Sequence, residues 1–155
     1  MAQLNIKNIK ALSPAILILG IIYLVIGIIS IINWCIALAN LGKQFYPNLI
    51  PGDLGFALVT LTVGASLTTS TYFIMRENIV MHLVSATCGA WLAVGALLIQ
   101  IMVAAATILD AIIVGDSIDY SIISENLLRS DVIMGCIILP ALIYYTSVLR
   151  KMVKA

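Results

Sequence analysis

The hydrophobic residues of this chain are gathered in four long uninterrupted stretches, separated by polar segments. A helix needs about 20 apolar residues to cross the roughly 30 Å hydrocarbon core of a bilayer. Membrane-spanning strands would instead alternate apolar and polar residues. The pattern therefore predicts an all-α, polytopic membrane protein, with a single integral membrane domain over residues 1–155 and spans at about 12–39, 54–75, 79–109 and 132–148.

Turn-forming and polar residues mark the connections between these spans. Pro47 and Pro51 interrupt the first connection, and the second consists only of residues 76–78. So short a turn makes the second and third spans antiparallel neighbours. The third connection, 110–131, is the longest and the most acidic, and its apolar spacing predicts a short surface helix or an extension of the fourth span. We therefore expect a four-helix up-and-down bundle.

Composition supports a location in lipid and excludes several classes of protein. Hydrophobic residues make up 63% of the chain and charged residues 10%, and the mean hydropathy is +1.16. Soluble domains average about 45 to 50% apolar and about 25% charged residues, and disordered chains are still more polar. The formal net charge of +1 leaves too little basic surface for a nucleic-acid binder. We therefore expect no nucleic-acid partner.

The distribution of lysine and arginine predicts which side of the membrane each end faces. With four spans, both termini and the second connection share one side, which carries six of the eight basic residues: Lys7, Lys10, Arg76, Arg150, Lys151 and Lys154. The other side has only Lys43 and Arg129, together with six of the seven carboxylates. Short cytoplasmic segments carry the excess of basic residues. We therefore expect a multi-pass protein of the cell membrane with both termini in the cytoplasm.

Small and weakly polar residues recur along one face of three predicted helices. Lipid gives helices no hydrophobic reason to associate, so contact faces in membranes use small residues and polar groups that bond across. The third span has the longest stripe, and shorter ones lie on the first and second: His82, Ser85, Gly89, Ala93, Ala96, Gln100 and Thr107; Gly20 and Gly27; Thr60, Gly64 and Thr68. The simpler interpretation is helix packing. The alternative is a polar path along the third span, from His82 to Asp110.

Four carboxylates of the third connection form the most strongly charged feature of the chain: Asp110, Asp116, Asp119 and Glu125. Calcium binds six to eight oxygen ligands, but the spacing of these residues matches no EF-hand loop. We therefore predict no metal site, and keep an outer cation site over these four residues as the weaker alternative. A basic partner protein would be drawn to the same surface.

Residues with catalytic potential are few and scattered. The single histidine, His82, excludes bis-histidine haem ligation and the multiple histidines common at catalytic zinc sites. Cys35, Cys88 and Cys136 fall in three different spans, and we expect them to be buried as small apolar residues. Pro140 lies well inside the fourth span and predicts a helix kink. Because the common catalytic and nucleotide-binding motifs are also missing, we expect neither enzymatic activity nor a cofactor.

These observations favour a non-catalytic integral membrane subunit, an accessory or assembly component of a membrane complex or of a homo-oligomer. Its partners would be the lipid bilayer and either other membrane chains or copies of itself. The first alternative is a small oligomeric channel or transporter with its path along the third span, although no charged residue lies near the middle of any span. The second is an enzyme subunit that relies on the cofactors of neighbouring chains.

Overall fold

The computed structural model describes residues 6–115, 124 and 127–153, which form helices joined by loops. Its long helices are α1 (Ile6–Ala39), α2 (Leu54–Met75), α3 (Ile79–Val114) and α5 (Ser130–Val153). All four are long and apolar enough to cross a membrane. The structure therefore confirms the predicted all-α class and the four candidate membrane-spanning helices.

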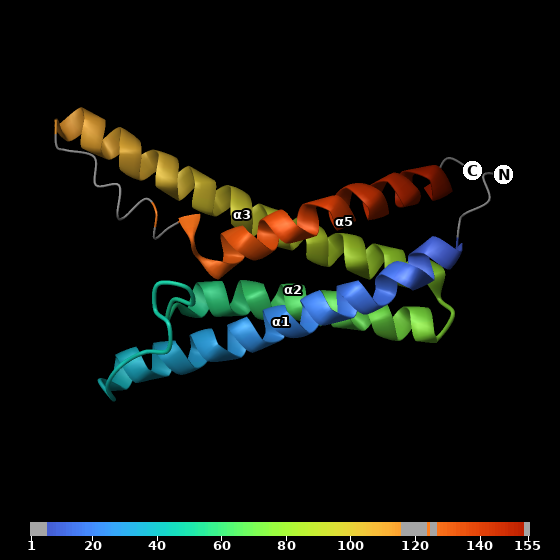
Figure 1. The fold of residues 1–155 in the computed structure, drawn as a ribbon, viewed down its shortest axis with the longest axis horizontal. Helices are drawn as coiled ribbons and strands as arrows, with labels where there is room; N and C mark the ends of the chain where they lie inside the picture. The colour runs from blue at the N-terminus through green and yellow to red at the C-terminus, as the bar shows by residue number, and fades with distance from the viewer. Residues whose placement is uncertain (1–5, 116–123, 125–126, 154–155) are drawn as a thin grey trace.

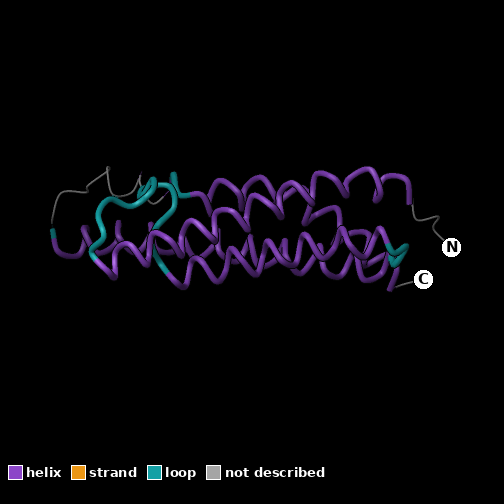
Figure 2. Tube along the Cα trace, turned by 90° about the horizontal axis from the view of Figure 1, so that it is seen from below, coloured by secondary structure: helices purple, strands orange, loops and turns teal. Residues whose placement is uncertain are grey.

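Each long helix packs mainly against the next one along the chain, α1 against α2, α2 against α3, and α3 against α5. Figure 1 shows the two chain ends at the same end of the bundle, which we call the termini end, and we call the opposite end the loop end. Figure 2 shows the helices running side by side along the long axis. Buried apolar side chains from all four helices, such as Ile16, Leu67, Leu83 and Ile138, form one core.

Side chains from the preceding turns cap α2 and α3. The carboxylate of Asp53 accepts hydrogen bonds from the backbone N–H groups of Gly55 (2.7 Å) and Phe56 (3.3 Å) at the start of α2. The side-chain oxygen of Asn78 accepts one from the N–H of Met81 (3.1 Å) at the start of α3. These bonds satisfy N–H groups that have no partner within the helix. α2 consequently covers the same residues as the second predicted span.

The other three helices are longer than predicted. α1 begins at Ile6 rather than at 12, α3 ends at Val114 rather than at 109, and α5 covers Ser130–Val153 rather than 132–148. Hydropathy locates the apolar part of a helix, whereas a helix ends where its backbone is capped or broken. α3 ends where Gly115 adopts a left-handed backbone with a φ of 77°. The predicted acidic connection is therefore shorter at both ends.

The predicted surface helix in this connection falls largely outside the described residues. Where the structure does describe it, the N–H of Leu128 donates a hydrogen bond to the carbonyl of Ser124 (2.9 Å). This four-residue spacing is that of an α-helical turn.

The structure corrects the prediction for the cysteines and adds a second helical proline. Cys35, Cys88 and Cys136 are free and exposed on the helix surfaces, not buried. A helix that is apolar on every side gives no sequence signal for which side faces the core. Pro140 lies inside α5 as expected, and Pro14 lies inside α1. Each proline removes one helical hydrogen-bond donor.

Candidate functional site

The small residues of the first and second predicted spans lie where α1 and α2 cross. A Cβ atom added to Gly20 would lie 2.9 Å from the Cγ2 atom of Thr68, and one added to Gly27 would lie 2.9 Å from the Oγ1 atom of Thr60. A Cβ atom added to Gly64 would lie at a similar distance from backbone atoms of α1. The two threonine hydroxyls donate hydrogen bonds to carbonyls of their own helix. The structure thus places these five residues in a closely packed helix interface.

The termini half of the third-span stripe faces α2. The Nδ1 atom of His82 lies 2.9 Å from the carbonyl oxygen of Ser70, and because a carbonyl only accepts, Nδ1 is the donor. The hydroxyl of Ser85 donates to the carbonyl of Ser66 (2.7 Å), and a Cβ on Gly89 would lie 3.0 Å from the Cβ of Ser66. Packing and hydrogen bonds to α2 therefore occupy this half of the stripe.

The loop half of the stripe changes its neighbour. Ala93 is buried, and its carbonyl oxygen would lie 3.4 Å from a Cβ on Gly135 of α5. Ala96 and Gln100 are half-buried, and the Oε1 atom of Gln100 has no hydrogen-bond partner in the described part of the chain. Thr107 donates to a carbonyl of its own helix (3.0 Å). The stripe on α3 thus contacts α2 in its termini half and α5 near Ala93, and Thr107 bonds within the final stretch of α3 itself.

α3 continues beyond the loop-end limits of both helices that it packs against. Since Ser66 of α2 lies beside Gly89, the first residue of the antiparallel α2, Leu54, is level with about residue 100 of α3. The contact of Gly135 with Leu97 puts the start of α5 near the same level. Figure 1 shows α3 running on past both helices. We call residues 101–114 the α3 extension.

The α3 extension is mostly apolar, and most of its large side chains are exposed, although Ala104 is buried and Thr107 and Ile108 are half-buried. Met102 is 70% exposed and Ile113 is 81% exposed, and Leu109, Ile112 and Val114 are each more than half exposed. At about 1.5 Å per residue, this stretch is about 21 Å long. Soluble proteins rarely expose a continuous apolar surface of this kind. The α3 extension therefore requires cover from lipid or from protein.

The predicted acidic cluster is described only at its first member. Asp110 is exposed on the α3 extension, whereas Asp116, Asp119 and Glu125 lie outside the described residues. Among the residues that the structure describes, no three His, Cys, Asp or Glu side chains come together as a metal site would require.

The first connection folds back on α1 at the loop end. The side-chain amide of Asn33 donates to the carbonyls of Phe45 and Ile50 (2.8 Å each) and accepts from the N–H of Phe45 (2.7 Å). The hydroxyl of Ser30 donates to the carbonyl of Pro51 (2.6 Å). Both side chains are fully buried. These bonds supply partners for backbone groups that no helix satisfies.

α5 begins against this folded connection. The N–H of Ser130 donates to the carbonyl of Leu49 (3.0 Å), and the guanidinium of Arg129 lies over the ring of Phe56 (5.3 Å). The Nε atom of Arg129 is 3.5 Å from the carboxylate of Asp131, which is 4% exposed. At the loop end, these polar contacts therefore join α1, the first connection, the start of α2 and the start of α5.

His82 sits deeper than a residue at the mouth of a polar path would. Its side chain is fully buried, and its ring meets the ring of Tyr145 edge to face with centroids 5.6 Å apart. The Nε2 atom of His82 and the hydroxyl of Tyr145 have no hydrogen-bond partner among the described residues. His82 thus joins α2, α3 and α5 near the termini end.

Several of these residues were missed by sequence reasoning. Asn33 and Asp131 are polar residues at the edge of apolar spans, which was the available signal for buried hydrogen-bonding roles. The projection of α3 had no such signal, because it depends on which residues of α2 and α5 lie beside it. Comparison of the chain with protein-family models, with curated proteins and with solved structures gives no match.

Proposed function

We propose that this protein is a non-catalytic integral membrane subunit that associates, through the α3 extension, with other membrane chains or with copies of itself. The observation that carries the proposal is the projection of this apolar stretch beyond α2 and α5. α2 has 22 residues and is about 33 Å long, whereas α3 has 36 residues and is about 54 Å long. Only the shorter length matches a hydrocarbon core of about 30 Å.

The first connection limits how far the hydrocarbon reaches toward the loop end. Residues 40–53 are irregular chain and include the exposed Lys43. Irregular backbone exposed to lipid does not occur within the hydrocarbon region. The hydrocarbon therefore ends near the start of α2, and the α3 extension lies beyond it. Protein is then the cover that fits this apolar surface.

The proposed orientation has both termini in the cytoplasm of a cell-membrane protein. It rests on six basic residues on the side of the termini and two on the other side. An epitope tag after Ala155 should be reached by antibody only after the membrane is permeabilised. A tag inserted at Gly42, where the chain borders open space, should be reached in intact cells. The opposite pattern would contradict the orientation.

Site-specific photo-crosslinking tests the association directly. A photoreactive amino acid at Ile113 on the α3 extension should give a protein adduct of defined mass in native membranes. The matched control is Ile18, which is 59% exposed on the membrane-spanning part of α1 and should give lipid adducts. An adduct of twice the chain mass identifies a second copy, and a different defined mass identifies another subunit. Lipid or water adducts alone at Ile113 would contradict the proposal.

A polar substitution separates specific association from chance proximity. Ile113→Gln should lower the fraction of the chain that remains in the complex in mild detergent, because it removes apolar contact area without touching the core of the bundle. The same fraction in Ile113→Gln and in wild type would count against the α3 extension as the interface. The transport alternative has weaker support, since His82, Ser85 and Gly89 are engaged with α2.

A further inference from the structure

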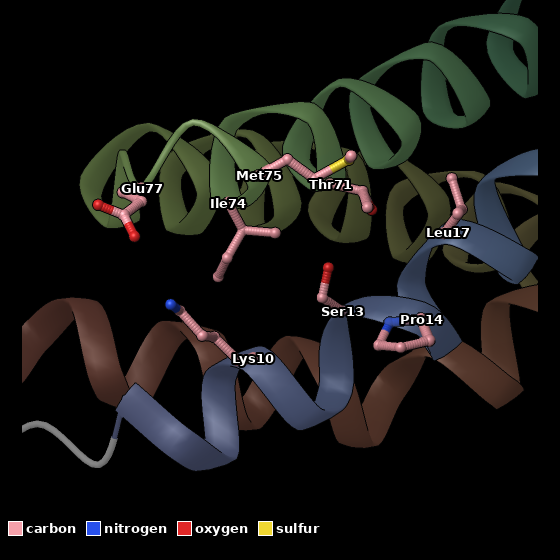
Figure 3. A pocket seen from close by; sticks show the side chains of 8 residues that line it. All are labelled: Lys10, Ser13, Pro14, Leu17, Thr71, Ile74, Met75 and Glu77. Carbon is pink, nitrogen blue, oxygen red and sulfur yellow. The ribbon is translucent and has the colours of Figure 1, made fainter.

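A pocket of about 410 Å³ opens between α1 and α2 at the termini end. Lys10 and Ser13 of α1 line one wall, and Thr71 of α2 and Glu77 of the following turn line the other. Figure 3 shows Lys10 and Ser13 extending toward the wall that carries Glu77 and Thr71. Small-molecule sites have volumes of about 300 to 1,000 Å³ and a few convergent polar groups. The pocket has both properties.

Two charged side chains of this pocket are available to a ligand, and a third polar side chain is buried in its wall. Thr71 is 8% exposed, and its buried hydroxyl has no hydrogen-bond partner among the described residues. Lys10 and Glu77 lie on opposite walls and form no ion pair with each other. The ion pair in the described part of the chain joins Arg129 and Asp131. Lys10 and Glu77 are both exposed, so a ligand that carries one anionic and one cationic group can pair with both.

The pocket lies at the level of a membrane surface. The guanidinium of Arg76 lies 5.3 Å from the centre of the Tyr72 ring, and Tyr72 is 52% exposed on the outside of the bundle. Tyrosine and basic side chains gather where the hydrocarbon meets the headgroups. Because these two residues adjoin Thr71 and Glu77 in the chain, the pocket opens among lipid headgroups.

The pocket also has an apolar side. Pro14 and Leu17 of α1 and Met75 of α2 line it. Leu17 lies one helical turn beyond Ser13, toward the middle of the bundle. Across the antiparallel helices Met75 is level with Ser13, and Thr71 is level with Leu17. The two charged side chains, Lys10 and Glu77, thus lie at the membrane-surface end of the pocket and Leu17 at its deeper end, as a ligand with a charged head and an apolar tail requires.

We propose that this pocket binds the headgroup of a zwitterionic phospholipid that carries a primary amine. The phosphate pairs with the ammonium of Lys10, and the amine donates hydrogen bonds to the carboxylate of Glu77. The first acyl carbons then follow Leu17. One cation facing one anion suits a neutral zwitterion, whereas an anionic lipid would be repelled by Glu77.

Discrimination between amine headgroups provides the test. A trimethylated amine keeps its charge but has no N–H to donate, so it loses the hydrogen bond to Glu77. The full chain is equilibrated in vesicles with equal amounts of phosphatidylethanolamine and phosphatidylcholine of matched acyl chains. It is then extracted in mild detergent, and bound lipids are counted by native mass spectrometry.

Wild type should retain phosphatidylethanolamine over phosphatidylcholine by about tenfold, the effect of a charge-assisted hydrogen bond. Glu77→Gln should bring the two lipids close to parity. Lys10→Gln should lower retention of both, since both carry the phosphate. The matched control is Lys151→Gln, an exposed basic residue at the same end but outside the pocket, which should behave as wild type.

A conservative variant of Glu77 keeps the test independent of folding. Glu77→Asp keeps the carboxylate and should recover part of the preference that Glu77→Gln loses. Equal retention of the two lipids by wild type, or equal effects of Lys10→Gln and Lys151→Gln, would overturn the proposal. Binding of soluble phosphoethanolamine without retained lipid would also overturn it and assign the pocket to a free zwitterion. The α3 extension lies at the other end, so this result is separate from the test of association.

Discussion

Replacement of Gly64 by alanine tests whether backbone approach between α1 and α2 holds the first hairpin together. The added Cβ would lie 2.8 Å from the backbone nitrogen of Leu24 and 2.9 Å from the carbonyl oxygen of Gly20. Ordinary van der Waals contacts of a Cβ begin at 3.4 Å. Both close atoms belong to the backbone, so a change of side-chain rotamer does not relieve the contact. The two helices must instead separate by several tenths of an ångström.

The expected destabilisation follows from two opposing effects. Overpacking of a close interface costs about 1 to 3 kcal/mol. Alanine in place of glycine within a helix recovers about 0.5 to 1 kcal/mol. Gly95 provides the matched control, because it also lies inside a long helix and an added Cβ there has no atom within 4 Å. Gly64→Ala should therefore be less stable than Gly95→Ala by about 2 kcal/mol, roughly a thirtyfold change in the unfolding equilibrium.

Reversible unfolding in mixed micelles, followed by helical circular dichroism, measures this difference directly. Wild type, Gly64→Ala and Gly95→Ala are compared at the same detergent composition, because micelle composition changes the apparent free energy of unfolding. Gly95→Ala should unfold at a slightly higher denaturant concentration than wild type, because alanine favours the helix by about 0.5 to 1 kcal/mol, and Gly64→Ala should unfold earlier than both. Equal midpoints for the two alanine variants would refute the importance of close backbone approach at this crossing.

Three further substitutions test the polar contacts inside the bundle. Asn33→Ala should lower the free energy of unfolding by about 1 to 3 kcal/mol, because it leaves buried backbone groups without partners, and it should speed proteolysis of residues 40–53. The exposed Asn48→Ala should do neither. Equal cleavage of the two variants would contradict this role of Asn33. Arg129→Gln should lower the free energy of unfolding by about 3 kcal/mol, because it leaves the buried Asp131 carboxylate unpaired. Adding Asp131→Asn to this variant should recover part of the loss. Additive losses in the double variant would exclude the pairing. His82→Phe should change the unfolding free energy by at most about 1 kcal/mol, and a much larger loss would show that the ring nitrogens matter more than packing.

The sequence predicted the helices better than their ends. Long apolar runs identify spans because lipid leaves an uninterrupted helix as the only simple way to satisfy the backbone. The end of α2 was predicted correctly because hydropathy and the turn at Arg76 coincide there. The end of α3 was not, because Asp110 suggested a boundary while the helix continues to the glycine at 115. One charged residue does not break the hydrogen-bonding pattern of a helix.

Packing partners were predictable only as a general property. The spacing of Gly20, Gly27 and Gly64 indicated close helix approach, and the structure shows close contacts at all three glycines. The hydrogen bond of His82 to Ser70 was not predictable, because it depends on the rotation of two neighbouring helices. The pocket between Lys10 and Glu77 has the same origin, since these residues are far apart in sequence and on different walls.

The α3 extension links helix formation to association. Its sequence favours a helix, with three consecutive alanines at 104–106 and a left-handed glycine that closes the last turn. A helix end that projects into water without packing partners is nevertheless marginal, because most helical stability in proteins comes from packing. Backbone amides of residues 101–114 should therefore exchange hydrogen faster in the isolated chain than in the native complex, while those of α2 exchange slowly in both. Equal protection of residues 101–114 in the two states would mean that this stretch is stabilised within one chain, and association would then have no role in ordering it.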